Sequence, residues 1–175
     1  MADWLWYFWI YSFAGYLLER AFALATHAPK QRRKCFLLLP LCPVYGLGVA
    51  AVLALPEPWR AWPWMLLTGA AVTTAVEYAV HWGYETFLGV AVWDYTGVPG
   101  NLNGRVCLPF TAAWGVLAAV GLRWLQPLLA QAVPKIPAAV TLAALVVFTA
   151  DAVCSARYLW LTHDTEGLHP GSLLG

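Results

Sequence analysis

The chain has 175 residues, of which 61% are hydrophobic and 11% are charged, and its formal net charge is +1. Soluble domains carry roughly 25% charged residues, so this composition excludes an ordinary soluble domain. The balanced charge offers no polybasic surface, which argues against a nucleic-acid partner. We therefore expect an all-α, polytopic membrane protein that is surrounded by a lipid bilayer.

Five apolar stretches are candidates to cross a hydrocarbon core of roughly 30 Å. They cover residues 4–26, 35–55, 61–88, 106–126 and 137–161, and the segments between them are short and basic or contain proline. The first stretch lacks a preceding basic region and an A-x-A site, so it is expected to remain as a helix. Residues 1–175 are thus predicted to form a single integral membrane domain of about five transmembrane helices.

The distribution of Lys and Arg predicts the orientation of these spans. Six basic residues fall on the side of the first loop, and three fall on the opposite side. This bias favours an external N-terminus and a cytoplasmic C-terminus.

A short sequence pattern that occurs twice at the same spacing indicates two parallel helical-hairpin repeats followed by a fifth helix. Leu39-Pro40 is followed by Tyr45-Gly46, and Leu108-Pro109 is followed by Trp114-Gly115 at the same spacing. Pro40 and Pro43 also interrupt the start of the second span, which predicts either a kink or a broken helix there.

The four cysteines are Cys35, Cys42, Cys107 and Cys154, and no two of them form a C-x-x-C pair. We therefore expect neither a disulfide framework nor a zinc knuckle.

Ionisable residues inside spans cost about 2.5–3.5 kcal/mol each on insertion scales and usually mark functional sites. By helical rise, those in this chain lie near the midplane or in the predicted inner half of the bilayer. We predict a polar cavity open to the cytoplasm, with a substrate or ion pathway formed by Glu19, Glu77, His81, Glu85 and Asp151. Arg20 and Arg157 are interpreted as members of structural ion pairs, Arg20 with Glu85 and Arg157 with Glu85 or Asp94.

Glu77, His81 and Glu85 are spaced i, i+4, i+8, so they lie along one stripe of the third span. A Glu–His pair at this spacing can pass a proton or share a divalent metal ion, for which Glu77 and His81 are the only candidates. The alternative is a hydrogen-bonded ladder that ties this span to its neighbours.

The third loop combines aromatic, acidic, amide and basic side chains with several turn-forming glycines. We expect it to serve either as an ordered cap or as a gate, through Trp93, Asp94, Tyr95, Asn101, Asn103 and Arg105. Asp94 is the expected partner of Arg105, with Glu85 as the second choice.

Several motifs together resemble one bacterial family. They are Phe8-Trp9-Ile10-Tyr11-Ser12-Phe13-x-Gly15 with Glu19, Leu39-Pro40-x-Cys42-Pro43-Val44-Tyr45-Gly46, Glu77 with Glu85, Trp93-Asp94-Tyr95, Asn101-x-Asn103-Gly104-Arg105-Val106-Cys107-Leu108, and Trp114-Gly115. The whole is similar to the CmpB-like permeases, called ABC-transporter type IV. The resemblance implies a bacterial inner-membrane protein with about five helices. The chain has no G-x-x-x-x-G-K-[ST] motif, so an ATPase would have to be a separate partner.

The leading functional hypothesis is a small transporter or channel that handles a cation or a proton-coupled solute. One alternative is a permease or substrate-binding subunit of a multi-component, ABC-like transporter. Another is a membrane-embedded enzyme acting on lipid, although the sequence carries no recognisable catalytic motif. Because five spans are few for a complete transporter, we expect a homo-oligomer or other membrane subunits. The sequence identifies no cofactor.

Overall fold

The computed structural model describes residues 2–26 and 35–165, and this part of the chain is helical apart from its connecting segments. The elements are α1 (Ala2–Ala25), α2 (Pro43–Leu53), α3 (Glu57–Arg60), α4 (Trp64–Gly83), the π-helical turn η1 (Tyr84–Leu88), α5 (Leu108–Val120), the π-helical turn η2 (Gly121–Leu125), α6 (Gln126–Ala132), the 3₁₀ turn η3 (Val133–Lys135) and α7 (Ala138–Thr162). Leu102 and Val106 form an isolated β-bridge in the loop that follows η1. The all-α prediction is confirmed for the described residues.

Two helices are long and apolar enough to cross a membrane. They are the continuous helix Leu108–Lys135, which comprises α5 to η3, and α7 (Ala138–Thr162). Both expose most of their apolar side chains, as expected for helices that face lipid or another subunit. The expected set of five spans stays a prediction.

The second predicted span differs most from its expectation. Residues 35–42 are not helical, and the helix that follows, α2, has 11 residues. At about 1.5 Å per residue, such a helix reaches only half of the hydrocarbon thickness. Pro43 occupies the first turn of α2, where its missing N–H costs nothing, and Pro40 precedes it in the irregular segment. The prolines thus accompany a broken helix and not a kinked one.

The helices pack as two hairpins, α1 with α2 and α4 with α5, and α2 also packs on α4. Glycines allow the close approach within each hairpin. A Cβ atom at Gly46 would collide with the carbonyl oxygen of Phe8, and one at Gly115 would collide with that of Leu66. Small residues at such positions are the usual means by which helices approach closely in membranes.

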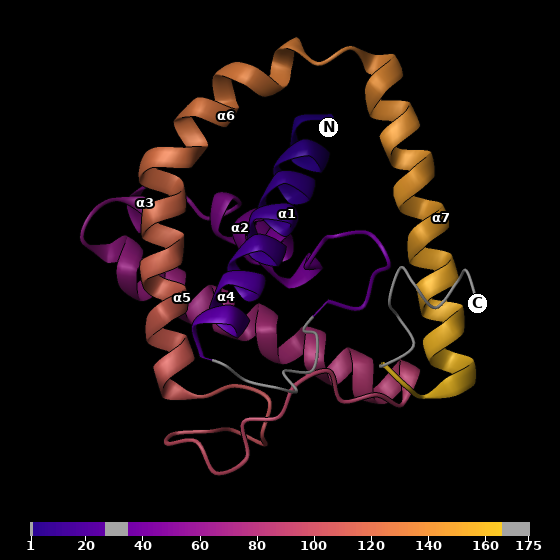
Figure 1. Cartoon of the computed structure of the whole chain (residues 1–175). Helices are drawn as coiled ribbons and strands as arrows, with labels where there is room; N and C mark the ends of the chain where they lie inside the picture. Colours follow the sequence, from indigo (N-terminus) through magenta and orange to yellow (C-terminus); the bar gives the residue numbers. More distant parts are fainter. Residues whose placement is uncertain (1, 27–34, 166–175) are drawn as a thin grey trace.

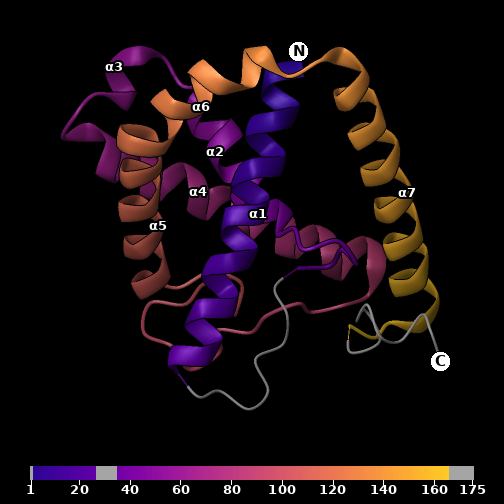
Figure 2. The ribbon, with the colours of Figure 1, turned by 45° about the horizontal axis from the view of Figure 1, so that its top comes forward.

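Helix α7 stands apart from the hairpins in both views (Figures 1 and 2). The segment from η2 to η3 leads across one end of the molecule to reach it, and its packing contacts include α1 and η1. Its long apolar side chains are mostly exposed, for example Leu142, Val146 and Trp160, each at about 60%. Helix α7 therefore presents a largely exposed apolar surface.

Candidate functional site

Glu77 is a buried residue of α4, and only 2% of its surface is exposed. The Tyr95 hydroxyl donates to its Oε1 at 3.0 Å, and the Trp114 indole N–H donates to its Oε2 at 2.8 Å. Burial and then the charge of Glu77 raise the pKa of Tyr95, which keeps its hydroxyl protonated and able to donate. Both carboxylate oxygens are thus held in fixed positions.

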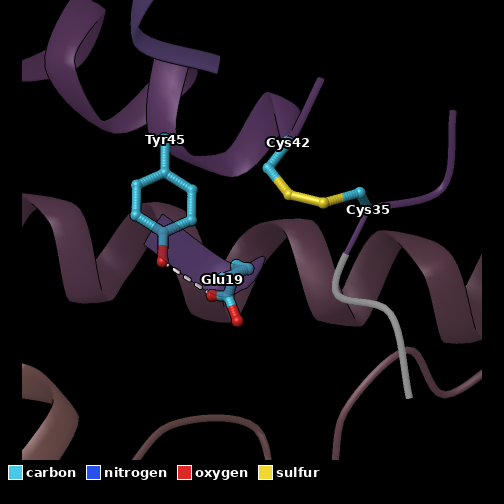
Figure 3. Close-up of a disulfide and its surroundings, with 4 residues drawn as sticks. All are labelled: Glu19, Cys35, Cys42 and Tyr45. Atoms are coloured by element: carbon cyan, nitrogen blue, oxygen red, sulfur yellow. Dashed lines mark hydrogen bonds between the residues drawn. A yellow bond between two sulfur atoms is a disulfide. The ribbon is translucent and has the colours of Figure 1, made fainter. Parts of the chain in front are cut away.

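Glu19 is the corresponding acidic residue on α1, and it is half-buried. The Tyr45 hydroxyl on α2 donates to Glu19 Oε1 at 2.6 Å, as Figure 3 shows. Tyr45 also lies within electrostatic range of Glu77. Its ring packs against the Trp114 ring at a centroid distance of 4.6 Å, which connects the two carboxylates through a pair of aromatic residues.

The two hairpins present the same pattern of contacts in the same register. In each, a carboxylate on the first helix accepts from an aromatic donor on the second, and a glycine directly follows that donor. Each of these glycines packs against a carbonyl that precedes its carboxylate by 11 residues, Phe8 before Glu19 and Leu66 before Glu77. The repeat proposed from the Pro-aromatic-Gly spacing therefore has matching contacts in three dimensions.

A crevice of about 400 Å³ opens beside the two carboxylates. Glu19 and Glu77 line it together with Tyr45 and Trp114, and the remaining walls are aliphatic or phenylalanine side chains from α1 and α5. An adjoining apolar pocket of about 240 Å³ shares Tyr45 and Trp114 and continues along the same two helices. The result is an apolar groove with its acidic groups at one end.

Contacts between the two helices lie at both ends of this groove. Phe22 and Phe110 meet edge to face at 6.2 Å near the carboxylates. At the far end, the Tyr11 hydroxyl donates to the Gly121 carbonyl at 3.1 Å and to Gln126 Oε1 at 3.2 Å. These contacts link α1 to the helix that contains α5, and the groove lies between them.

A second polar cluster ties the loop after η1 to α4. Arg105 Nε donates to Glu85 Oε2 at 2.7 Å, and its NH1 donates to the Tyr78 hydroxyl at the same distance. The hydrogen bond to Glu85 raises the pKa of Arg105 above its ordinary value. The preferred partner Asp94 was therefore wrong, and the second choice Glu85 is correct. Asp94 instead accepts from the backbone N–H of Thr96, because an Asp can close a turn onto its own chain two residues on.

His81 is buried at 2% exposure between these clusters. Its Nε2 lies 2.7 Å from the carbonyl oxygen of Trp93, so this nitrogen carries a proton and donates. Its Nδ1 lies 3.5 Å from Glu85 Oε2. Both ring nitrogens thus face protein oxygens. Across residues 2–26 and 35–165, no three His, Cys, Asp or Glu side chains are arranged to hold a metal ion.

The remaining loop residues close the loop on itself and on α4. The Trp93 indole donates to the Arg105 carbonyl at 2.8 Å, and Asn103 donates to the Tyr78 hydroxyl at 2.9 Å. Asn103 adopts the left-handed region at φ 54°, which asparagine tolerates well. Asn101 donates to the Val98 carbonyl at 3.0 Å. These contacts support the ordered-cap interpretation of the loop.

Asp151 does not lie with the other two carboxylates. Its side chain accepts from the backbone N–H groups of Leu38 at 3.1 Å and Leu39 at 3.3 Å. Ser155, one turn further along α7, accepts from Leu38 at 3.3 Å. The irregular segment 35–42 lacks helical hydrogen bonds, and in apolar surroundings such backbone groups must find partners. Asp151 supplies the acceptors for these N–H groups. Its depth in the sequence gave no sign of this role.

The same segment contains a disulfide between Cys35 and Cys42, contrary to the sequence prediction (Figure 3). The two Cα atoms are 4.5 Å apart. Residues seven apart in a continuous helix would be separated by about 10 Å, so the expected helix itself excluded the bond. The break in the helix brings the two cysteines together.

Arg20 and Arg157 are both exposed, and neither forms an ion pair within the described ranges 2–26 and 35–165. The expected pairing of Arg20 or Arg157 with Glu85 is wrong, because Glu85 is bound by Arg105 and faces His81. Long basic side chains can instead extend toward the membrane surface.

Sequence reasoning did not assign site roles to three aromatic residues. Tyr45 and Trp114 donate to the two carboxylates, and Tyr78 accepts from Arg105 and Asn103. Tyr45 and Trp114 are the aromatic residues of the repeated Leu-Pro…aromatic-Gly pattern. A buried carboxylate needs donors, and matching each Glu of a predicted span with an aromatic residue of its own hairpin would have found Tyr45 and Trp114.

A family model described as "Putative ABC-transporter type IV" matches residues 6–156. No curated protein and no solved structure matches the chain.

Proposed function

The chain belongs to the putative ABC-transporter type IV family, and from this premise we propose that it is a membrane transporter whose groove between α1 and α5 takes a cation or a proton-coupled solute. The family match and the two apolar helices support a membrane protein with a transport-related role.

The observation that carries the proposal is the joint lining of one crevice by Glu19 and Glu77. Two carboxylates in one apolar recess favour a positive charge between them, since electrostatic attraction is strong where water is scarce. The aromatic rings of Tyr45 and Trp114 border the same recess. Aromatic faces attract cations as well, most strongly when both are desolvated.

The two carboxylates would have different tasks. Glu77 is fixed by Tyr95 and Trp114, so it offers a preformed charge to the crevice. Glu19 is half-buried and would respond to the cargo by changing its bond with Tyr45. His81, one turn from Glu77 on α4, extends the polar stripe toward Glu85.

A second candidate function is that of one subunit in a larger transporter. The chain contains no nucleotide-binding G-x-x-x-x-G-K-[ST] motif, so it would depend on a separate ATPase. The exposed apolar side chains of α7 offer a surface for another membrane subunit or a second copy of the chain. In either case we propose a bacterial inner-membrane location with the N-terminus outside.

The test is electrical recording from proteoliposomes on a solid-supported membrane, with jumps in proton, Na⁺, K⁺ or tetramethylammonium concentration. We expect a protein-dependent current with at least one of these cations. Glu77→Gln should reduce it by about tenfold or more, because a charged hydrogen-bonding partner contributes about 1.5–3 kcal/mol. Asp164→Asn removes a charge at an exposed position and should behave as the wild type.

Glu19→Gln provides the second variant, since Glu19 is less buried and its loss threatens folding less. It should also lower the current. Wild-type currents equal to those of empty liposomes with all four cations would contradict the proposal. So would full currents in both glutamine variants.

A further inference from the structure

A separate polar pocket of about 350 Å³ lies among α3, the start of α4, η2 and α6. Glu57, Arg60, Trp62, Arg123 and Gln126 are among its lining residues. The elements that form it lie at the end of the molecule opposite to the loop between η1 and α5 (Figure 2). It therefore has no part in the site built around Glu19 and Glu77.

Arg60 and Arg123 are the two arginines that line this pocket. Within residues 2–26 and 35–165, neither Arg60 nor Arg123 forms an ion pair or a side-chain hydrogen bond. The Nε atom of Arg60 is buried and has no hydrogen-bond partner. Buried donors are nearly always satisfied in proteins, so this N–H needs an acceptor that the described residues do not supply.

The other polar side chains of the pocket are consistent with an external acceptor. Gln126 Oε1 accepts from Tyr11, which leaves the amide NH₂ of Gln126 as a donor. Glu57 lines the pocket but forms no ion pair with Arg60 or Arg123 in the described structure. Two guanidinium groups against one carboxylate leave the pocket with an excess of one positive charge.

We propose that this pocket binds a phosphate group, held by the guanidinium groups of Arg60 and Arg123 and by the amide of Gln126. Arginine forms planar, paired hydrogen bonds that match phosphate oxygens, and it does so better than lysine. A phosphate diester also carries a single negative charge, which neutralises the excess.

The surroundings of the pocket correspond to the level of lipid headgroups. Trp59, Trp62, Trp64 and Trp124 are all exposed, at 58–73%. Tryptophans gather at the membrane–water interface, where the phosphates of lipids lie. A phospholipid headgroup and free inorganic phosphate offer the same chemistry, and the experiment has to separate them.

The experiment uses the purified full-length chain in two arms. In the first, native mass spectrometry measures retention of phosphatidylglycerol from mixed micelles. In the second, thermal unfolding is followed with increasing inorganic phosphate, with chloride at equal ionic strength as the reference. We expect the wild type to retain phosphatidylglycerol. Retention should fall by about tenfold in Arg60→Gln and in Arg123→Gln, because each variant loses a charge-assisted hydrogen bond.

Lys135→Gln is the matched control, because Lys135 is an exposed basic residue at the same end of the molecule and does not line the pocket. Its lipid retention should equal that of the wild type. Arg123 is exposed, so its replacement should leave folding intact even if Arg60→Gln does not fold. Stabilisation by inorganic phosphate that is lost in Arg123→Gln would assign the site to a free anion. No effect of either probe, or responses to both probes that are the same in Arg123→Gln and the wild type, would overturn the proposal.

Discussion

The two hairpins share the same carboxylate–aromatic contact but differ in their connecting segments. Glu19 and Glu77 occupy corresponding positions, and each accepts from the aromatic residue of its own hairpin. The connecting segments differ, because the first hairpin turns through the irregular stretch 35–42 while the second turns through the long loop 89–107. From that loop Tyr95 reaches back to Glu77 and supplies a second donor. The helices thus set where the carboxylates lie, and the loops determine how firmly each is held.

Replacing each carboxylate by alanine gives the largest expected contrast between the hairpins. Glu77→Ala would remove the acceptor of two buried donors, on Tyr95 and Trp114. At about 1–3 kcal/mol for each lost bond, unfolding should become easier by about 2–6 kcal/mol. Glu19→Ala removes the partner of Tyr45 at a half-buried site and should cost about 1 kcal/mol. Unfolding in detergent measures both, and equal losses would show that the loop does not strengthen the second site.

The glycine contacts test what the hairpins have in common. Gly46→Val and Gly115→Val each place side-chain atoms against a backbone carbonyl of the opposite helix. We expect similar losses of about 1–3 kcal/mol in the two variants, because the helices must separate. Gly83→Ala is the control, since its added Cβ would meet only Phe87 at 4.0 Å. A clear difference between Gly46 and Gly115 would contradict the equivalence of the hairpins.

The smallest effect is expected from the loop that distinguishes the second hairpin. Arg105→Ala removes the bonds to Glu85 and Tyr78 without touching Glu77. Amide exchange across residues 93–106 should become faster, by about tenfold if about 1.4 kcal/mol of local stability is lost. Exchange within α5 should not change. Unaltered exchange in the loop would mean that the Trp93 and Tyr95 contacts hold it without the arginine.

Sequence patterns predicted much of this arrangement and failed for identifiable reasons. Apolar runs located α1, α4 and α7 to within a few residues, and the Pro-aromatic-Gly echo indicated the related hairpins. Helical rise, however, compares depth and not direction around the axis. It therefore grouped Asp151 with Glu19 and Glu77, although Asp151 binds the backbone at Leu38 and Leu39. Likewise, an assumed continuous helix over 35–55 hid the Cys35–Cys42 bond.

The bonds between Asp151 and the backbone of residues 35–42 have a consequence for how the protein is made. The carboxylate–aromatic bonds within each hairpin involve residues up to Trp114 only, all of which are synthesised before α7. Helices in lipid gain little from apolar contact, so polar bonds such as those of Asp151 strengthen docking once a helix has been inserted. Biosynthesis can therefore assemble the paired hairpins first. When α7 docks, Asp151 then accepts hydrogen bonds from the backbone N–H groups of Leu38 and Leu39, which lie outside any helix.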